Sequence, residues 1–311
     1  MRVLVTGAAG QLGQALLQTC PAVVGGQPVE LVATSRDGGP GLQALDLADP
    51  DACRSIVKQW HPDWLINAGA YTAVDQAELE PELAYAVNAG APQAFAEALN
   101  DYGGRLLQIS TDFVFQGDQG SPYRPDQSTN PIGIYGSSKA AGEEAVLNQL
   151  GAHRLAVILR TSWVYGPVGR NFLLTMLRLH QDRAASGTDL RVVADQVGCP
   201  TATPGLATAC WRVLMSAEER SGDEVPQILH WSDAGVASWY DFAIAIGELA
   251  EQWGLLQKSA IVSPISTAEY PTPARRPAYS LLDCLSSRRV LRLPEQHWRQ
   301  SLSNVMQRMK P

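Results

Sequence analysis

The sequence predicts an α/β fold, in which a doubly wound parallel sheet is followed by a smaller C-terminal lobe. Three observations support this prediction. Short β-branched apolar runs alternate with longer alanine-rich stretches, a glycine-rich turn follows the first apolar run, and the alternation weakens after about residue 165. Alternating strands and helices form right-handed βαβ units, whose parallel strands are covered on both faces.

The first half of the chain alternates between predicted strands and predicted helices. The strands are residues 2–6, 29–34, 64–68, 105–110 and 156–161, and the helices are residues 11–19, 50–59, 81–100 and 137–150. Asp49 is placed to cap the second helix, because its carboxylate can accept free backbone N–H groups. Pro81 suits the first position of the third helix, where its missing N–H is not needed.

The second half of the chain is less regular. Residues 172–180, 203–215 and 238–253 are predicted helices, residues 196–204 a predicted loop, and residues 263–277 a proline-rich segment. We therefore expect a first domain over residues 1–165. Residues 166–311 should form mainly the second lobe, with some segments returning to the first domain and a ligand cleft between the two.

The composition is that of a soluble globular protein, with 45% hydrophobic and 18% charged residues among 311. The net charge of −7 argues against binding to nucleic acid or to an anionic membrane surface. The five cysteines have no metal-ligand spacing, and no apolar stretch suits a signal peptide or a membrane span. We expect a cytoplasmic protein.

The glycine-rich turn is the strongest single motif. Gly7, Gly10 and Gly13 lie between the first strand and the first helix, with GxxGxxG spacing. Glycines there permit a tight turn and a close approach to a pyrophosphate, which the free N–H groups of a helix N-terminus bind. This context predicts a Rossmann dinucleotide-binding domain. The spacing resembles the extended branch of the short-chain dehydrogenase/reductase superfamily.

The residues after the second and third strands bear on the choice of cofactor. Arg36 stands where NAD-selective proteins of this type often carry an acidic residue for the ribose 2′-hydroxyl. A guanidinium suits a 2′-phosphate instead, although a solvated surface arginine is the alternative. We expect NADPH as the cofactor, with NADH as a usable second donor. Ala68, Gly69, Ala70 and Tyr71 end the third strand, at the edge that the cofactor should cross.

A candidate catalytic group follows the fourth strand. Thr111 and Asp112 end that strand, and Tyr135 and Lys139 lie four residues apart, on one face of the next helix. Reduction of a carbonyl needs a proton donor, and a nearby ammonium lowers the pKa of a tyrosine. We expect Tyr135 to be the acid, Lys139 to assist it and Thr111 to hold the carbonyl oxygen. Asp112 either binds substrate or caps the local turn.

Six segments carry a more specific resemblance. They are residues 67–78 (NAGAYTAVDQAE), 110–117 (STDFVFQG), 135–143 (YGSSKAAGE), 160–166 (RTSWVYG), 195–201 (DQVGCPT) and 273–277 (PARRP). On these segments the chain resembles the dTDP-4-dehydrorhamnose reductase family over essentially its whole length. The resemblance implies NADPH-dependent reduction of the 4-keto group of dTDP-4-dehydro-L-rhamnose to dTDP-L-rhamnose, by a Rossmann domain with a C-terminal substrate lobe.

The resemblance also implies roles for individual residues. Besides the glycine turn, the residues that would touch the cofactor are Gln11, Leu12, Asp46, Leu47, Ala70, Tyr71 and Thr72. Tyr135 would be the proton donor, and Lys139 would bind the nicotinamide ribose. The substrate sugar would meet Thr111, Asp112 and Trp163, and Arg275 or Arg276 would face the nucleotide diphosphate.

Two other functions compete with this one. The β regulatory subunit of methionine adenosyltransferase resembles the same reductase family, so a non-catalytic NADP-binding subunit is the first alternative. An epimerase or dehydratase that acts on another sugar nucleotide is the second. The set of Thr111, Tyr135 and Lys139 favours an enzyme over a regulatory subunit.

The last expectation concerns metal ions and assembly. Some relatives are linked to a magnesium ion that glutamates hold at a dimer interface. Carried over to this sequence, those positions are Ala15, Pro204 and, approximately, Arg308. None of these side chains can ligate a cation that prefers carboxylates. We therefore expect no magnesium, and both a homodimer and a monomer stay open.

Overall fold

A seven-stranded parallel sheet forms the centre of the molecule and confirms the predicted fold class. The computed structural model describes residues 1–219 and 225–309. From edge to edge the strands are β13 (Ile228–Trp231), β8 (Ala156–Thr161), β7 (Arg105–Thr111), β6 (Trp64–Asn67), β1 (Arg2–Thr6), β4 (Glu30–Ser35) and β5 (Gln43–Ala44). The strand order reverses between β1 and β6, and open α/β sheets bind ligands at the carboxyl ends of strands at such a point.

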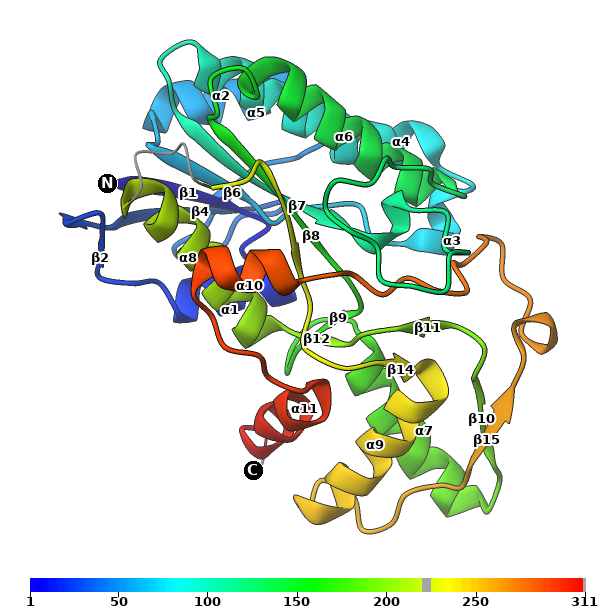
Figure 1. Ribbon diagram of the computed structural model, residues 1–311. Helices are drawn as coiled ribbons and strands as arrows, with labels where there is room; N and C mark the ends of the chain where they lie inside the picture. Colours follow the sequence, from blue (N-terminus) through cyan, green and yellow to red (C-terminus); the bar gives the residue numbers. More distant parts are fainter. Residues whose placement is uncertain (220–224, 310–311) are drawn as a thin grey trace.

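Helices cover both faces of the sheet (Figure 1). One layer consists of α2 (Pro50–Trp60), α5 (Ala91–Asn100) and α6 (Ile134–Leu150), and the other of α1 (Gln11–Gln18), α8 (Thr203–Glu219) and α10 (Leu285–Leu291). Side chains alternate along each strand. Leu4 of β1 therefore packs in the core under the first layer, whereas Val3 and Val5 pack under the second.

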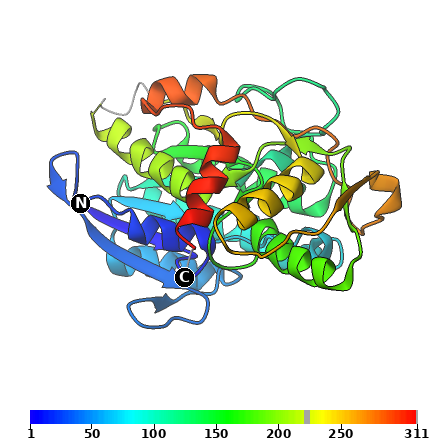
Figure 2. The same ribbon diagram turned by 90° about the horizontal axis from the view of Figure 1, so that it is seen from below.

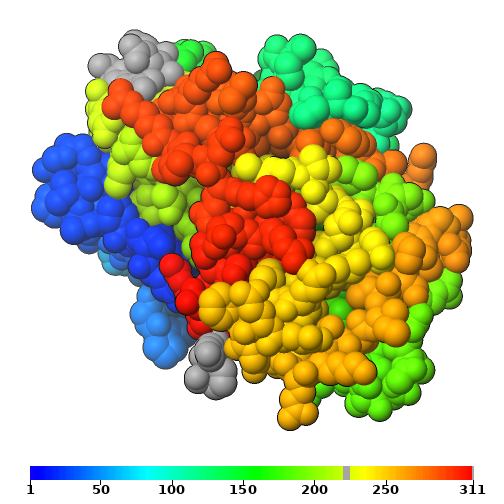
Figure 3. All heavy atoms as spheres, turned by 60° about the horizontal axis from the view of Figure 1, so that its bottom comes forward, coloured from blue at the N-terminus to red at the C-terminus, as the bar shows by residue number. Residues whose placement is uncertain are grey.

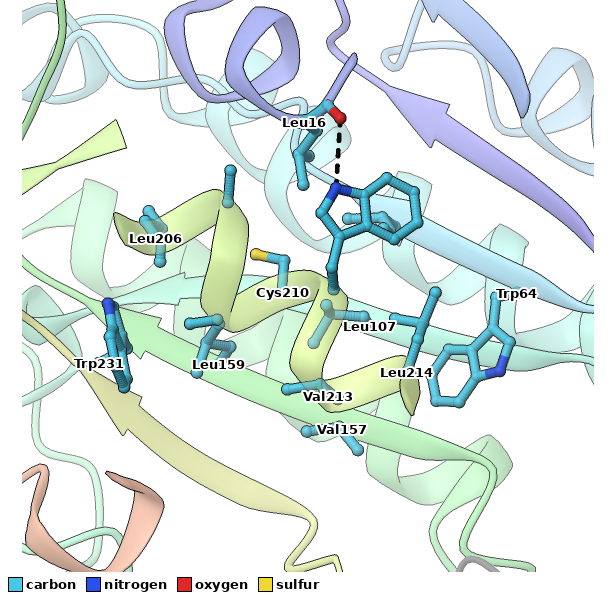
Figure 4. Close-up of a cluster of buried hydrophobic side chains, with 14 of the residues drawn as sticks. Leu16, Trp64, Leu107, Val157, Leu159, Leu206, Cys210, Val213, Leu214 and Trp231 are labelled. Atoms are coloured by element: carbon cyan, nitrogen blue, oxygen red, sulfur yellow. Dashed lines mark hydrogen bonds between the residues drawn. The ribbon is translucent and has the colours of Figure 1, made fainter. Parts of the chain in front are cut away.

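The second layer is partly built by the C-terminal half of the chain. Trp211 of α8 is buried and donates its indole N–H to the Leu16 carbonyl of α1 (3.2 Å; Figure 4). Leu214 on the same helix packs with Leu107 of β7. β13 then pairs with β8 and extends the sheet. Segments beyond residue 165 therefore complete the sheet and its core.

The single helix predicted over residues 81–100 is wrong. The structure has α4 (Pro81–Tyr85), one π-helical turn (Ala86–Gly90) and then α5. The cause is Pro92, which has no N–H to donate to the Asn88 carbonyl four residues earlier, so the turn widens. The buried Asn88 side chain is held from outside the helix, by the Tyr71 backbone and by Ser138 of α6.

The second lobe has a core of its own. It contains α7 (Phe172–Ser186), α9 (Trp239–Gln252), α11 (Trp298–Gln307) and the parallel pair β10 (Leu190–Val193) and β15 (Val262–Ile265) (Figure 2). Phe242 is fully buried, with its ring centroid 5.3 Å from Phe172 and 5.9 Å from Trp298. The C-terminal segment, drawn in red, packs beside the gold helix α9 (Figure 3).

The predicted loop over residues 196–204 contains two short strands. β11 (Val197–Gly198) pairs with β14 (Ala237–Ser238), and β12 (Thr201–Ala202) pairs with β9 (Val164–Tyr165). Two-residue pairs are too short to leave an apolar pattern in a sequence. The remaining elements are β2 (Val23–Val24), β3 (Gln27–Pro28), α3 (Val74–Ala77), η2 (Asp112–Val114) and η3 (Thr267–Glu269). No helix in the described ranges has the length and apolar character to cross a membrane.

Candidate active site

The glycine turn brings three segments into close contact. Gly7 has φ +64°, and a Cβ there would lie 2.6 Å from the Cα of Gly69 in the loop after β6. A Cβ on Gly13 would lie 2.2 Å from the Gly7 carbonyl oxygen. Both positions therefore require glycine, because β1, α1 and the loop after β6 could not otherwise approach one another.

The start of α1 fits a dinucleotide pyrophosphate. Gly10 is the N-cap and offers no side chain, and the backbone N–H groups of Gln11, Leu12 and Gly13 have no partner among the described residues. Such free donors, at the positive end of the helix dipole, bind anions. The side chain of Gln11 points elsewhere, donating to the Val164 carbonyl (3.1 Å).

Three residues that were predicted to touch the cofactor lie beyond β4 and β5. Arg36 is exposed, and within the described part of the chain it makes no ion pair. Asp46 accepts the N–H of Ala48 (2.9 Å), which closes a local turn. Leu47 packs over Gly69, where a Cβ would lie 2.4 Å from the leucine Cδ1. Leu47 thus lines the switch point, and Arg36 is free to bind an anion.

The loop after β6, from Ala68 through Thr72, is fixed from behind. The Asn88 side chain accepts the N–H of Tyr71 (2.9 Å) and donates to its carbonyl (3.0 Å). The Tyr71 hydroxyl donates to Glu80 (2.7 Å), and this bond raises the pKa of Tyr71 to about 12. The phenol is therefore engaged within the protein, while Thr72 is exposed.

Tyr135 and Lys139 lie in the first two turns of α6. Lys139 is 4% exposed, donates from Nζ to the Ile109 carbonyl (2.7 Å), and has its pKa lowered to about 8 by burial. Burial raises the pKa of Tyr135 to about 12, against an opposing hydrogen bond from Thr111. The lowered pKa expected from the spacing of Tyr135 and Lys139 is therefore not found. The phenol keeps its proton at neutral pH, as a proton donor must.

Asp112 contributes an unpartnered carboxylate oxygen beside the phenol. One of its oxygens accepts the Thr111 hydroxyl (3.0 Å), and the other, Oδ2, has no partner among the described residues although Asp112 is only 2% exposed. Burial raises the pKa of Asp112 to about 6, and a hydrogen bond from Ser280 opposes the rise. A buried oxygen without a partner is suited to receive a hydroxyl of a bound molecule.

Trp163 joins the site to the second lobe. It adopts φ +46°, and its ring stacks on Trp239 with 3.6 Å between centroids and an interplanar angle of 6°. Trp239 in turn lines a cleft of about 760 Å³ between α7 and the pair of β10 and β15. Three guanidinium groups also line this cleft, those of Arg183, Arg191 and Arg276.

Arg276 also connects the two halves of the molecule. Its guanidinium binds both carboxylate oxygens of Asp75 (2.7 and 3.0 Å), which lowers the pKa of Asp75. The N–H of Ala274 donates to the same carboxylate (3.1 Å). Arg275 is exposed. Of the two arginines predicted to face a diphosphate, Arg276 thus lines the cleft while paired with Asp75, and Arg275 points to solvent.

Comparison with known proteins places this geometry in a family. The sequence model of the RmlD substrate binding domain matches residues 1–310. A dTDP-4-dehydrorhamnose reductase from Aggregatibacter actinomycetemcomitans is 38% identical over 307 residues, which are 98% of either chain. The chain belongs to the dTDP-4-dehydrorhamnose reductase family. The resemblance inferred from the six segments is confirmed, and the chain is an NAD(P)H-dependent oxidoreductase.

Solved structures of dTDP-4-dehydrorhamnose reductases have the same fold. The enzyme from Clostridium acetobutylicum has a TM-score of 0.85 at 33% identity, with all of both chains covered. The enzyme from Bacillus anthracis, solved in complex with NADP, has a TM-score of 0.83 at 33% identity, with 98% of both chains covered.

Several residues at the site were not singled out from the sequence. Asn88 holds the Tyr71 backbone, Ser280 reaches Asp112, and Trp239 covers Trp163. These contacts join positions far apart in the chain, so a local pattern could not reveal them. Glu143 and Arg160 are different, because both belong to segments that carried the resemblance, and a charged residue within an otherwise apolar motif was an available signal.

Proposed function

We propose that the protein reduces the 4-keto group of dTDP-4-dehydro-L-rhamnose to give dTDP-L-rhamnose, with NADPH as the hydride donor. One observation carries this proposal: a protonated Tyr135 lies beside Thr111 and Lys139, next to the switch point of a sheet that fits a dinucleotide. Membership of the reductase family supports both the substrate and the cofactor.

The residues divide the work between positioning and proton transfer. NADPH, when bound, supplies the hydride. Thr111 holds the carbonyl oxygen, and Tyr135 gives it the proton that balances the developing alkoxide. Lys139 binds the nicotinamide ribose. Asp112 accepts a sugar hydroxyl at its free oxygen, and Trp163 packs against the sugar.

The cofactor and substrate occupy different parts of the chain in this proposal. Residues 1–165 hold the cofactor, through Gly7, Gly10, Gln11, Leu12, Gly13, Arg36, Asp46, Leu47, Ala68, Gly69, Ala70, Tyr71, Thr72, Tyr135 and Lys139. Residues 166–311 supply the substrate lobe, apart from α8, β13 and α10, which return to the sheet. The protein works in the cytoplasm, a compartment that suits its five free cysteines.

Stoichiometry distinguishes this reaction from the two alternatives. A reductase consumes one NADPH for each molecule of dTDP-4-dehydrorhamnose converted. An epimerase or dehydratase retains its cofactor through the cycle, and a regulatory subunit turns nothing over. Measured conversion without equivalent NADPH loss, or no conversion at all, would contradict the proposal.

Arg36→Ala should reduce the preference for NADPH over NADH. The unpaired guanidinium of Arg36 can bind a 2′-phosphate, and hydrogen bonds to charged groups are worth about 1.5–3 kcal/mol. We therefore expect the ratio of kcat/KM for the two cofactors to fall by about tenfold or more. The matched control is the neighbouring Asp37→Asn, which should leave the ratio above the wild-type value or unchanged. A wild-type preference for NADH that Arg36→Ala does not alter would rule out this role.

Activity should survive removal of divalent cations. Within residues 1–219 and 225–309 no group of three or more His, Cys, Asp and Glu side chains is placed to hold a metal ion. Ala15 is buried in the core, and Pro204 lies in the first turn of α8. We expect the same rate and the same molecular mass by light scattering with and without EDTA. A loss of mass or activity that magnesium restores would show that a metal site exists.

A further inference from the structure

A buried carboxylate lies one helical turn beyond Lys139. Glu143 is 4% exposed and accepts hydrogen bonds from Arg160 at both of its oxygens, from Nη2 to Oε2 (2.6 Å) and from Nε to Oε1 (2.9 Å). The hydroxyl of Ser110 also donates to Glu143. Arg160 is 2% exposed, so this ion pair is removed from solvent on both sides.

The partners of Glu143 flank the groups that hold the reacting residues. Ser110 of β7 and Arg160 of β8 are directly opposite in the parallel ladder. Ile109, before Ser110, accepts the Lys139 ammonium, and Thr111 follows Ser110. Glu143 therefore ties α6 to β7 and β8 at the point where Lys139 and Thr111 meet.

The charges around Lys139 leave Glu143 as its counter-ion. The ionisable side chains packed around this region are Tyr135 and Glu143 of α6, Asp112 after β7, Arg160 of β8 and, behind Arg160, His230 of β13. Burial and the Arg160 charge lower the pKa of His230 to about 3, so it is neutral. Burial lowers the pKa of Lys139, and the carboxylate that opposes this is that of Glu143.

We propose that Glu143 is a positioning residue whose buried negative charge keeps Lys139 in its ammonium form at neutral pH. The inference rests on the proposed function, in which Lys139 binds the cofactor ribose. A purely structural role is the competing explanation, in which Glu143 serves only to neutralise Arg160. Breaking a buried ion pair from one side is costly, whereas replacing both partners is often tolerated. The two roles therefore make different predictions for single and double variants.

The test is the pH dependence of kcat/KM for NADPH in Glu143→Gln, with Glu144→Gln as the matched control. Glu144 is adjacent, and it is exposed. Activity needs the Lys139 ammonium, so it falls as pH rises through the pKa of Lys139; the Tyr135 phenol loses its proton only near its own pKa of about 12. Loss of an opposite charge shifts a buried group by about one unit or more. We expect the alkaline limb of Glu143→Gln to move down by about one pH unit and activity to recover at pH 6.

A double variant separates the charge effect from loss of the fold. Glu143→Gln with Arg160→Met removes both buried charges. If Glu143 acts on Lys139, the double variant keeps the downward shift, and the dissociation constant for NADPH, measured by nucleotide fluorescence, shifts over the same pH range. A wild-type profile in the double variant would overturn the inference, as would an unshifted profile in a folded Glu143→Gln.

Failure of the underlying function gives a different result. If Lys139→Ala keeps wild-type turnover and NADPH affinity, Lys139 has no role and the proposed function itself is wrong in that respect. If Lys139→Ala is inactive while the Glu143→Gln limb stays at the wild-type pH, only the inference about Glu143 is overturned.

Discussion

Tyr135→Phe is expected to lower kcat by about 10²- to 10⁴-fold, the usual contribution of a general acid. The substitution removes the one hydroxyl that stands beside Thr111 on α6 and leaves the ring in its edge-on contact with Phe113, with 5.5 Å between centroids. The pKa of Tyr135, raised to about 12 by burial, means that the phenol carries its proton across the working pH range. The measurement is kcat under saturating NADPH and substrate.

Cofactor binding provides the control for this prediction. NADPH affinity should change little in Tyr135→Phe, because the glycine turn, Arg36 and Lys139 are untouched. Tyr71→Phe is the matched variant, since it also removes a phenol near the switch point, but one that is bonded to Glu80. Near-wild-type turnover in Tyr135→Phe would exclude Tyr135 as the acid.

Lys139→Ala should damage both turnover and cofactor affinity. The ammonium is buried, binds the Ile109 carbonyl and has no other cation near it to take over its role. A hydrogen bond to a charged group contributes about 1.5–3 kcal/mol, so NADPH should bind about tenfold or more weakly. Loss of kcat with unchanged NADPH affinity would contradict the ribose-binding role, and it would point to an effect on Tyr135 alone.

The parallel sheet could be predicted because its signals are local. Each strand is a short apolar run buried on both faces, and the glycine turn lies between a strand and a helix, where the conformation of Gly7 demands glycine. Tyr135 and Lys139 are likewise one helical turn apart, so spacing alone places them on one face.

The parts that could not be predicted depend on distant contacts or on single exceptions to a pattern. The apolar pattern of residues 81–100 suits one helix, and only the missing N–H of Pro92 breaks it. Arg276 and Asp75 are 201 residues apart, and nothing local to either residue marks the pair. The pKa of Tyr135 depends on burial, which the spacing of the motif does not reveal.

Oxidation of NADPH with purified dTDP-4-dehydro-L-rhamnose, run beside a panel of other nucleotide-linked 4-keto sugars, tests the central claim most directly. The account predicts one NADPH consumed for each dTDP-L-rhamnose formed, with the highest kcat/KM for this substrate and no turnover by Lys139→Ala. Conversion without NADPH consumption, or a clear preference for another sugar of the panel, would contradict it.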